Sequence, residues 1–288
     1  MTQRFGVILI AFVIFSGATS RSQVKVSGGD QQIRKIQLTR AVRIPVIKAS
    51  GTDNSGGARG QDSTSMAIWP GATDELAEGP CGFDVLDDGS LLITDPISRR
   101  VSVYDAQGKF RRVWDVGFAP DSITVTSDGF VLVREASTGQ IHVFDREGKS
   151  RPGVEAKAPV QPQARVLTGK TGTVSSMSRS GLAGGSIAVR FDEPGSALLS
   201  LESLGTDPDR GTFVALEAAT HEKGDDDAID VKKSVRRYAL DGRLVSEISN
   251  IPLDYYVVPV DELRVHKGVV YQLMTTSTEV RINEWDTN

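Results

Sequence analysis

Apolar and polar residues alternate in short runs along most of the chain beyond residue 79. The run Val101 to Tyr104 (VSVY) is typical, because its apolar side chains fall at every second position and turn residues follow it directly. Alternation with a period of two is the pattern of a strand that is buried on one face. We find no helical periodicity beyond the N-terminal twenty residues. The pattern therefore predicts an all-β protein.

One strand-rich unit occurs twice. Residues 79–109 (GPCGFDVLDDGSLLITDPISRRVSVYDAQGK) align without a gap with residues 119–149 (APDSITVTSDGFVLVREASTGQIHVFDREGK), a shift of 40 residues, 119 minus 79. The identical positions include Pro80 with Pro120, Val85 with Val125, Asp88-Gly89 with Asp128-Gly129, Val103 with Val143, Asp105 with Asp145, and Gly108-Lys109 with Gly148-Lys149. This agreement at turns and strands indicates an internal repeat.

Each unit is expected to form four antiparallel strands. In the first copy these are Phe83 to Leu86, Ser90 to Thr94, Val101 to Tyr104 and Phe110 to Trp114. The pair Asp88-Gly89 suits a tight hairpin, since both residues tolerate a positive φ. Four antiparallel strands in a unit of this length are the blade of a β-propeller.

Weaker copies extend the pattern to the C-terminus. The expected blades are residues 79–117, 118–157, 160–200, 201–250 and 257–285, and residues 40–78 are a candidate sixth. The last copy lacks an outer strand, which an early strand, Ile33 to Leu38 or Val42 to Ile47, would supply by closing the ring. We therefore expect a six-bladed propeller, with five blades as the alternative, closed by an N-terminal strand.

The N-terminus is predicted to be a secretory signal. Arg4 precedes the ten-residue apolar run Gly6 to Phe15, and the small residues Ser16 to Ser20 follow it. Ten residues are too few to cross a hydrocarbon core of about 30 Å as a helix, so no permanent membrane span is expected. The predicted organisation is a signal peptide over residues 1–20, a closing strand and irregular blade over 21–78, and propeller blades over 79–288. A secreted or periplasmic location follows.

Net charge and cysteine content narrow the possible partners and cross-links of the protein. A formal net charge of -4 and a pI near 5.5 supply no broad positive field, so no nucleic-acid partner is expected. The single cysteine, Cys81, excludes an internal disulfide. No segment suggests oligomerisation, and a monomer is the expectation.

The two clear units resemble blades of the NHL-type repeat, six-bladed β-propeller superfamily. The resemblance lies in the D-x-D-G turn with its following strand and in the R-V-x-V-Y-D-x-x-G-K run. It is strong over residues 79–150 and degenerate over 158–285. It implies a propeller fold, and members include extracytoplasmic binding modules, lactonases and lyases, so it leaves the chemistry open.

An acidic residue recurs at one position of the repeat. Asp95, Glu135 and Glu217 each lie six residues after a turn glycine, whereas the last copy has Met274 there. Equivalent positions share one face of a propeller, so these three carboxylates are candidate ligand-binding residues for a cation or a polar ligand. Alternatively, each carboxylate accepts hydrogen bonds from backbone amides of its own loop.

Other catalytic signals are sparse. His142, His221 and His266 are the only histidines, and none has metal-ligand spacing with another, which disfavours a three-histidine zinc centre. The ligands that gluconolactonase-like relatives would bring from separate blades have no residue-by-residue match here. No catalytic residue is predicted.

Two functions remain open. The main expectation is a non-catalytic exported propeller that binds a protein, peptide or glycan through loops on a rigid scaffold. The alternative is a metal-dependent, lactonase-like hydrolase or lyase with its site at the axial opening. Whether the chain is an enzyme is uncertain at this point, and the sequence favours a protein that is not one. No cofactor is expected under the first function, and a divalent cation under the second.

Overall fold

The computed structural model describes residues 33–49, 64–154, 165–166, 171–177, 183–190, 196–221 and 229–288. Within these ranges every regular element is a β-strand, which confirms the all-β class. The predicted signal segment, residues 1–20, lies outside them. No helix in the described ranges is long and apolar enough to cross a membrane.

The two repeat units form sheets A and B. Sheet A is an antiparallel meander of β4 (Phe83–Val85), β5 (Leu91–Asp95), β6 (Arg100–Tyr104) and β7 (Phe110–Asp115). Sheet B contains β8 (Pro120–Val125), β9 (Val131–Glu135) and β10 (Ile141–Phe144), and an antiparallel bridge from Phe144 to Ser150 stands where the fourth strand was expected. The predicted hairpins are present because Gly89 and Gly129 adopt the positive φ that their turns require.

Sheets C and D follow along the chain. Sheet C pairs β12 (Thr171–Met177) with β13 (Ala183–Arg190). Sheet D has the order β1-β17-β16-β15-β14-β11. Its strands are β1 (Arg34–Lys35), β11 (Arg165–Val166), β14 (Ser196–Asp207), β15 (Gly211–His221), β16 (Ile229–Tyr238) and β17 (Leu244–Ile251). The degenerate copy at residues 201–250 therefore does form an antiparallel meander.

Sheet E combines the two ends of the chain. It contains β18 (Leu263–His266), β19 (Val269–Thr275), β20 (Glu279–Asp286), β2 (Arg40–Lys48) and β3 (Met66–Ile68). β2 pairs antiparallel with β20, from Arg40 opposite Glu284 to Pro45 opposite Glu279. Of the two candidates for the outer strand of this sheet, the one at Val42 to Ile47 pairs there. The other contains β1, which pairs in parallel with β17 of sheet D.

Residues 40–78 do not form a sheet of their own among the described residues. Their strands β2 and β3 belong to sheet E, and the described strands make five sheets. The number of blades and the closure of a ring stay predictions.

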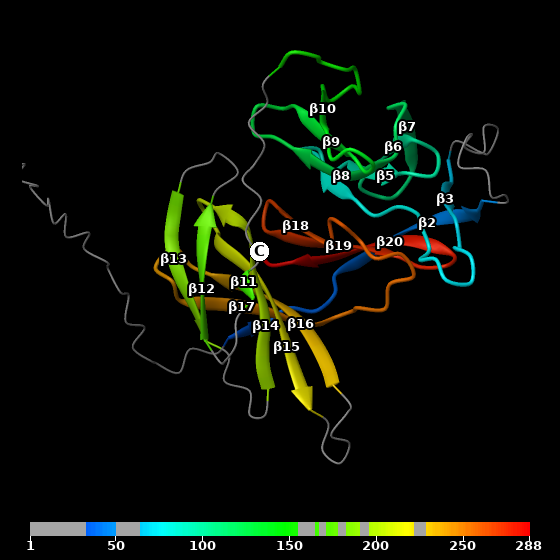
Figure 1. Cartoon of the computed structure of the whole chain (residues 1–288). Helices are drawn as coiled ribbons and strands as arrows, with labels where there is room; N and C mark the ends of the chain where they lie inside the picture. Colours follow the sequence, from blue (N-terminus) through cyan, green and yellow to red (C-terminus); the bar gives the residue numbers. More distant parts are fainter. Residues whose placement is uncertain are drawn as a thin grey trace, which may run out of the picture.

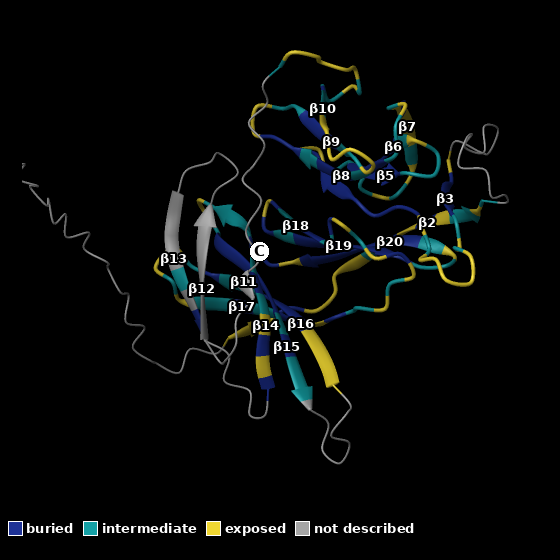
Figure 2. Cartoon of the chain, in the orientation of Figure 1, coloured by how far each residue is buried: buried dark blue, intermediate teal, exposed yellow. Residues whose placement is uncertain are grey.

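Four apolar cores lie between successive sheets. Phe83 of sheet A packs with Ile44 of sheet E, Trp114 of sheet A with Ile123 of sheet B, and Phe213 of sheet D with Leu263 of sheet E. Leu216 of sheet D packs with Val189 of sheet C. The sheets are therefore stacked in the order C, D, E, A, B, and Figure 1 shows sheet E between the labels of sheet D and those of sheets A and B. Much of β18, β19 and β20 is buried (Figure 2).

Candidate functional site

Asp95 ends β5 and is completely buried. Its carboxylate accepts a hydrogen bond of 3.0 Å from Nε of Arg100 and one of 3.2 Å from the backbone amide of Ser98. Burial raises the pKa of Asp95, and the charge of Arg100 opposes that shift. The side chain therefore fixes the loop between β5 and β6.

Glu135 ends β9 and is partly exposed. Its two carboxylate oxygens accept hydrogen bonds of 2.9 Å from the hydroxyls of Ser137 and Thr138, and Nε2 of His142 lies 3.4 Å away. These two hydroxyls hold the pKa of Glu135 below its ordinary value. Like Asp95, this carboxylate closes its own loop.

Glu217 lies within β15 and faces sheet E. It accepts hydrogen bonds from Nζ of Lys233 at 2.8 Å and from the hydroxyl of Ser200 at 3.1 Å. Burial raises the pKa of Glu217, but the hydrogen bond and charge of Lys233 outweigh it, and the pKa lies below its ordinary value. The three recurring acids thus have separate partners on sheets A, B and D. Their binding of a ligand stays a prediction.

Lys233 is the centre of a buried charged network between sheets D and E. Its side chain is 9% exposed and contacts the carboxylates of both Glu217 and Glu262. Glu262, which directly precedes β18, also accepts a hydrogen bond of 2.5 Å from the hydroxyl of Tyr255. Burial lowers the pKa of Lys233, yet the two carboxylates outweigh that effect and raise it, so the ammonium group stays charged.

Glu202 lies in the same network but has no direct partner. It is half-buried on β14, and its carboxyl makes no hydrogen bond or ion pair with the residues that the structure describes. Burial raises its pKa, and repulsion from Glu262 and Glu217 adds to the shift, against attraction from Lys233 and Arg264. The raised pKa means that this carboxyl keeps its proton to a higher pH than an ordinary glutamate does, which is a feature of residues that act as general acids or bases. We name these five residues, Glu202, Glu217, Lys233, Glu262 and Arg264, the Glu202 cluster.

Arg264 connects this cluster to sheets A and B. Its guanidinium lies 2.6 Å from the Asp261 carboxylate and 4.0 Å from the Asp84 carboxylate. Asp261 accepts a hydrogen bond from the amide of Ile123 at 2.9 Å, and Asp84 accepts one from the amide of Val125 at 2.7 Å. The first strands of three sheets are thereby joined through buried carboxylates at the edge of the cluster.

Other candidates identified from sequence do not add to this site. Burial raises the pKa of the Cys81 thiol to about 12, so the thiol is neutral at pH 7 and behaves as a small core residue. His142 stacks on Phe118, and the side chain of His221 lies outside the described residues. No group of three potential metal-ligating side chains (His, Cys, Asp or Glu) occurs in the described ranges.

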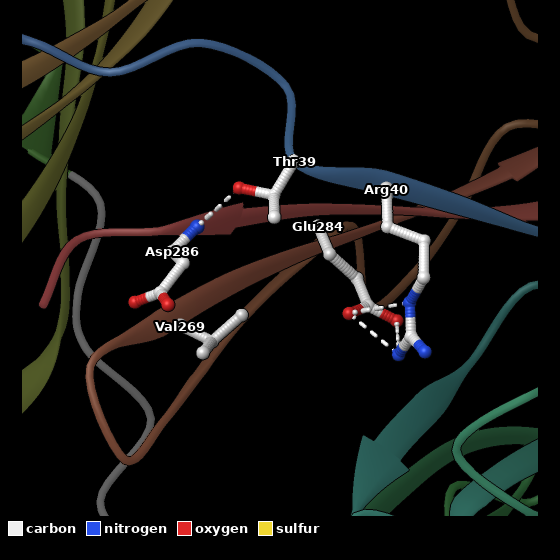
Figure 3. Close-up of a pocket in the computed structure, with 5 residues that line it drawn as sticks. All are labelled: Thr39, Arg40, Val269, Glu284 and Asp286. Carbon is white, nitrogen blue, oxygen red and sulfur yellow. Dashed lines mark hydrogen bonds and ion pairs between the residues drawn. The ribbon is translucent and has the colours of Figure 1, made fainter.

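A separate candidate is an open pocket of about 380 Å³ on sheet E. Figure 3 shows its five lining residues, Thr39, Arg40, Val269, Glu284 and Asp286. The guanidinium of Arg40 and the carboxylate of Glu284 form an ion pair at 2.6 Å, so the two charges neutralise each other. The threonine hydroxyl accepts a hydrogen bond from the Asp286 amide. These groups are engaged with one another, and the pocket is a weaker candidate than the Glu202 cluster.

Of the five cluster residues, the sequence analysis singled out Glu217 and missed the other four, Glu202, Lys233, Glu262 and Arg264. Glu202 lies in the alternating strand SALLSLESLGTD, where a carboxylate among inward-facing apolar positions is the only local signal. Lys233 lies in a run of polar residues, a pattern that predicts an exposed segment. Their proximity depends on the pairing of β14, β15 and β16, which the repeat did not define in this half of the chain.

Comparisons with known proteins identify no family. No family model matches the chain, so NHL membership is not shown, and no curated protein matches it. Among solved structures, a gluconolactonase from Xanthomonas campestris is 15% identical, with a TM-score of 0.33 over 72% of this chain and 85% of its own.

Two further structures are similarly distant. A member of the DUF4221 family from Bacteroides vulgatus is 8% identical, with a TM-score of 0.28 over 87% of this chain and 97% of its own. A virginiamycin B lyase from Staphylococcus aureus is 14% identical, with a TM-score of 0.22 over 72% of this chain and 69% of its own. The gluconolactonase and the lyase are both β-propeller enzymes. Likeness at these TM-scores establishes neither substrate nor mechanism for this chain.

Proposed function

We propose that the described sheets are blades of a β-propeller. Two glycines related by the repeat support this arrangement. A Cβ on Gly108 of sheet A would lie 2.4 Å from Cγ1 of Val42 on β2, and a Cβ on Gly148 of sheet B would lie 2.2 Å from the Trp114 ring on β7. β2 of sheet E therefore contacts the turn glycine of sheet A in the same way as β7 of sheet A contacts the turn glycine of sheet B. In a propeller, this is the position of an outer strand of the preceding blade.

Within this scaffold, we propose that the chain is a hydrolase or lyase that acts on a small polar molecule at the Glu202 cluster. The observation that carries the proposal is the Glu202 carboxyl, which is half-buried among charged groups and has no hydrogen-bond partner among the described residues. Structural carboxylates in this chain, such as those of Asp95 and Asp261, accept hydrogen bonds from neighbouring side chains or backbone amides. An unengaged carboxyl with a raised pKa is expected where a proton must be transferred.

The chemistry we assign to Glu202 is general acid-base catalysis. In its protonated form it would donate a proton to a departing oxygen, and in its ionised form it would accept one from water or from the substrate. The positive charges of Lys233 and Arg264 lie near enough to act on its pKa, and they would stabilise negative charge that develops on the substrate. Glu217 and Glu262 keep Lys233 charged and in place.

We assign no step to a metal ion. The expected lactonase-like alternative was metal-dependent, and the described residues contain no group of three potential ligands. Asp95 and Glu135, which were expected to contribute, are bonded to their own loops on different sheets. Our proposal therefore does not use a divalent cation, and its binding by Asp95, Glu135 and Glu217 stays a prediction.

A second candidate is the non-catalytic module that binds a protein, peptide or glycan. One observation favours it. Tyr256, Val258 and Val260, in the segment before Asp261, expose 38%, 69% and 47% of their surface, whereas Val257 is buried. An exposed apolar row on a rigid scaffold suits a macromolecular partner. Export to a secreted or periplasmic location and a monomeric state belong to both candidates as proposals.

The experiment is a turnover screen of sugar lactones, aryl esters and uronate-containing glycans with the purified protein. Glu202→Gln keeps the shape of the side chain and removes its acid-base function, and Glu147→Gln, at an exposed turn, is the matched control. We expect turnover by the wild type and the control and a loss of at least about a hundredfold in Glu202→Gln. Turnover that survives in Glu202→Gln would overturn the assignment, and saturable binding without any turnover would favour the second candidate.

A further inference from the structure

The pocket of about 380 Å³ on sheet E lies on two neighbouring rows of side chains. In the first row, Tyr271 of β19 lies opposite Glu284 of β20, which in turn lies opposite Arg40 of β2. In the next row on the same face, Val269 lies opposite Asp286. Opposite residues in antiparallel strands have Cβ atoms about 4.5 to 5.5 Å apart, and residues i and i+2 share one face. These side chains therefore form one continuous surface.

Bonds between the lining residues hold this surface in place. Nη2 of Arg40 donates to both carboxylate oxygens of Glu284, at 2.6 and 2.7 Å, and Nε donates to Oε2 at 3.1 Å. The Thr39 hydroxyl accepts a hydrogen bond of 3.0 Å from the Asp286 amide. Figure 3 shows both sets of bonds. Because the polar groups are positioned by the protein itself, a ligand loses little affinity to ordering them.

The same residues leave a donor and an acceptor open to solvent. Nη1 of Arg40 makes no hydrogen bond with the described residues, and the Arg40 side chain is 42% exposed. Asp286 is exposed, and its carboxylate accepts hydrogen bonds from Asn288 through Oδ1 alone. The ion pair and the backbone bond therefore use only part of the hydrogen-bonding capacity of the pocket.

Tyr271 adds a hydroxyl that has no hydrogen-bond partner in the described part of the chain. The residue is only 8% exposed, but its hydroxyl is not among the fully buried atoms and so can meet a ligand. Burial raises the pKa of Tyr271 to about 12, with Glu284 and Asp286 adding to the shift and Arg40 opposing it. The hydroxyl therefore keeps its proton at neutral pH and lies beside the lining residues. A buried tyrosine ring usually has a partner for its hydroxyl.

This set of groups matches a neutral molecule that carries several hydroxyls. Each hydroxyl of a ligand can donate and accept, and the pocket offers Arg40 and Tyr271 as donors and Asp286 as an acceptor. Arg40 offsets the charge of Glu284, so the net charge that remains is the negative charge of Asp286, which disfavours an anion. Val269 adds apolar surface for C–H groups. The volume lies within the range of about 300 to 1,000 Å³ for small-molecule sites.

We propose that the pocket binds a polyhydroxylated molecule, namely a sugar ring or a cyclic polyol. Arg40 and Tyr271 donate hydrogen bonds to its oxygens, and Asp286 accepts hydrogen bonds from its hydroxyls.

The pocket is separate from the Glu202 cluster. Arg40 alternates along β2 with Val42 and Ile44, which belong to the core shared with sheet A, so the pocket lies on the side of sheet E that faces sheet A. The Glu202 cluster lies between sheets D and E, and the two sites have no residue in common. This inference therefore does not rest on the proposed function.

The test is an NMR titration of the full chain with D-glucose, D-galactose or myo-inositol, in which the backbone amide shifts are followed. We expect saturable shifts at Thr39, Arg40 and Asp286 with at least one of these compounds. Tyr271→Phe removes the hydroxyl and keeps the ring, so the apparent dissociation constant should rise about threefold to tenfold, as for one lost hydrogen bond. Tyr256→Phe, at an exposed tyrosine outside the pocket, should leave it unchanged.

The arginine is tested by a second pair of variants. Arg40→Gln should raise the apparent dissociation constant at least about tenfold, because it removes a charged donor and the ion pair that positions the pocket. Arg43→Gln, at an exposed arginine of the same strand that is paired with Glu279, should leave it unchanged. If Arg40→Gln does not fold, since Glu284 would lose its partner, the Tyr271→Phe variant decides the question.

Three results would overturn the proposal. One is the absence of saturable shifts with all three compounds. Another is an unchanged dissociation constant in Tyr271→Phe, which would place the ligand elsewhere. The third is a saturable response to the diamine putrescine alone, which would indicate a cation site at Asp286. Glu202→Gln should bind as wild type does, and shifts confined to the Glu202 cluster would support the proposed function while overturning this one, so the two tests fail independently.

Discussion

Carboxyl side chains in this chain differ in their hydrogen-bond partners because their surroundings differ. Asp95 and Glu135 recur in the repeat and were the natural candidates, yet each is bonded to its own loop. Glu202 follows no repeated pattern and is a half-buried carboxyl without a direct partner among the described residues. Spacing in the sequence identified the first two correctly as equivalent positions. It could not indicate which carboxyl would be left unengaged, because that depends on neighbours from other sheets.

The raised pKa of Glu202 predicts how stability responds to pH. Because the folded state binds this proton more tightly, the contribution of Glu202 to stability is present below pH 4.5, its ordinary pKa, and is lost as the pH rises through the folded value. Glu202→Gln should therefore be more stable than wild type at pH 8, and the difference should shrink towards pH 4. Urea unfolding at both pH values measures it.

Glu217→Gln is the control of opposite sign. The folded pKa of Glu217 is lowered, so its stabilising contribution is present above its ordinary pKa and is lost as the pH falls through the folded value. This variant should be less stable than wild type at pH 8. If the two variants respond to pH in the same direction, the assigned environments are wrong.

At the scale of the element, the sequence predicted the strands and turns that depend only on residues close together in the chain. The hairpins of sheets A and B follow from Asp-Gly turns and alternation, and strands β5 and β6 lie where the repeat put them. The pairing of β2 with β20 was one of two alternatives, since the apolar pattern of both N-terminal segments suits an outer strand. The expected sixth blade at residues 40–78 is not among the described sheets, because β2 and β3 complete sheet E instead.

The turn glycine of sheet B, Gly148, should be more sensitive to substitution than a positive-φ glycine that has open space beside it. Gly148→Ala would place a Cβ within 2.2 to 2.5 Å of the Trp114 ring, whereas Gly117→Ala, with a similar φ, meets no atom within 4 Å. We expect a cost of about 1 kcal/mol for Gly117→Ala from backbone strain, and about 3 kcal/mol for Gly148→Ala, where overpacking adds to it. Chemical unfolding measures both, and equal losses would contradict the contact between sheets.

At the scale of the whole molecule, the sheets are joined by contacts between residues far apart in the sequence. Arg264 of sheet E reaches Asp84 of sheet A, and Lys233 of sheet D reaches Glu262 beside β18. The candidate site exists only because these sheets pack side by side. A single sequence predicts the sheets one at a time, so it could not predict which charged side chains would meet between them.

The N-terminal strand β2 should be essential to the packing of sheets E and A. Ile44 is fully buried in their shared core, so Ile44→Ala should lower the free energy of unfolding by about 2 to 5 kcal/mol. Lys48→Ala, exposed on the same strand, should change it by less than about 0.5 kcal/mol. Denaturant titration distinguishes them, and a small effect of Ile44→Ala would show that β2 is not part of this core.

The central claim is that Glu202 is a poised carboxyl within a charged cluster, and NMR titration of its side-chain carboxyl carbon tests that claim most directly. Glu202→Gln identifies the resonance, and Glu217 in the same protein serves as an internal reference. We predict a midpoint above 4.5 for Glu202 and below 4.5 for Glu217. A midpoint for Glu202 at or below 4.5 would contradict the account, because the carboxyl would then be an ordinary solvated or paired group.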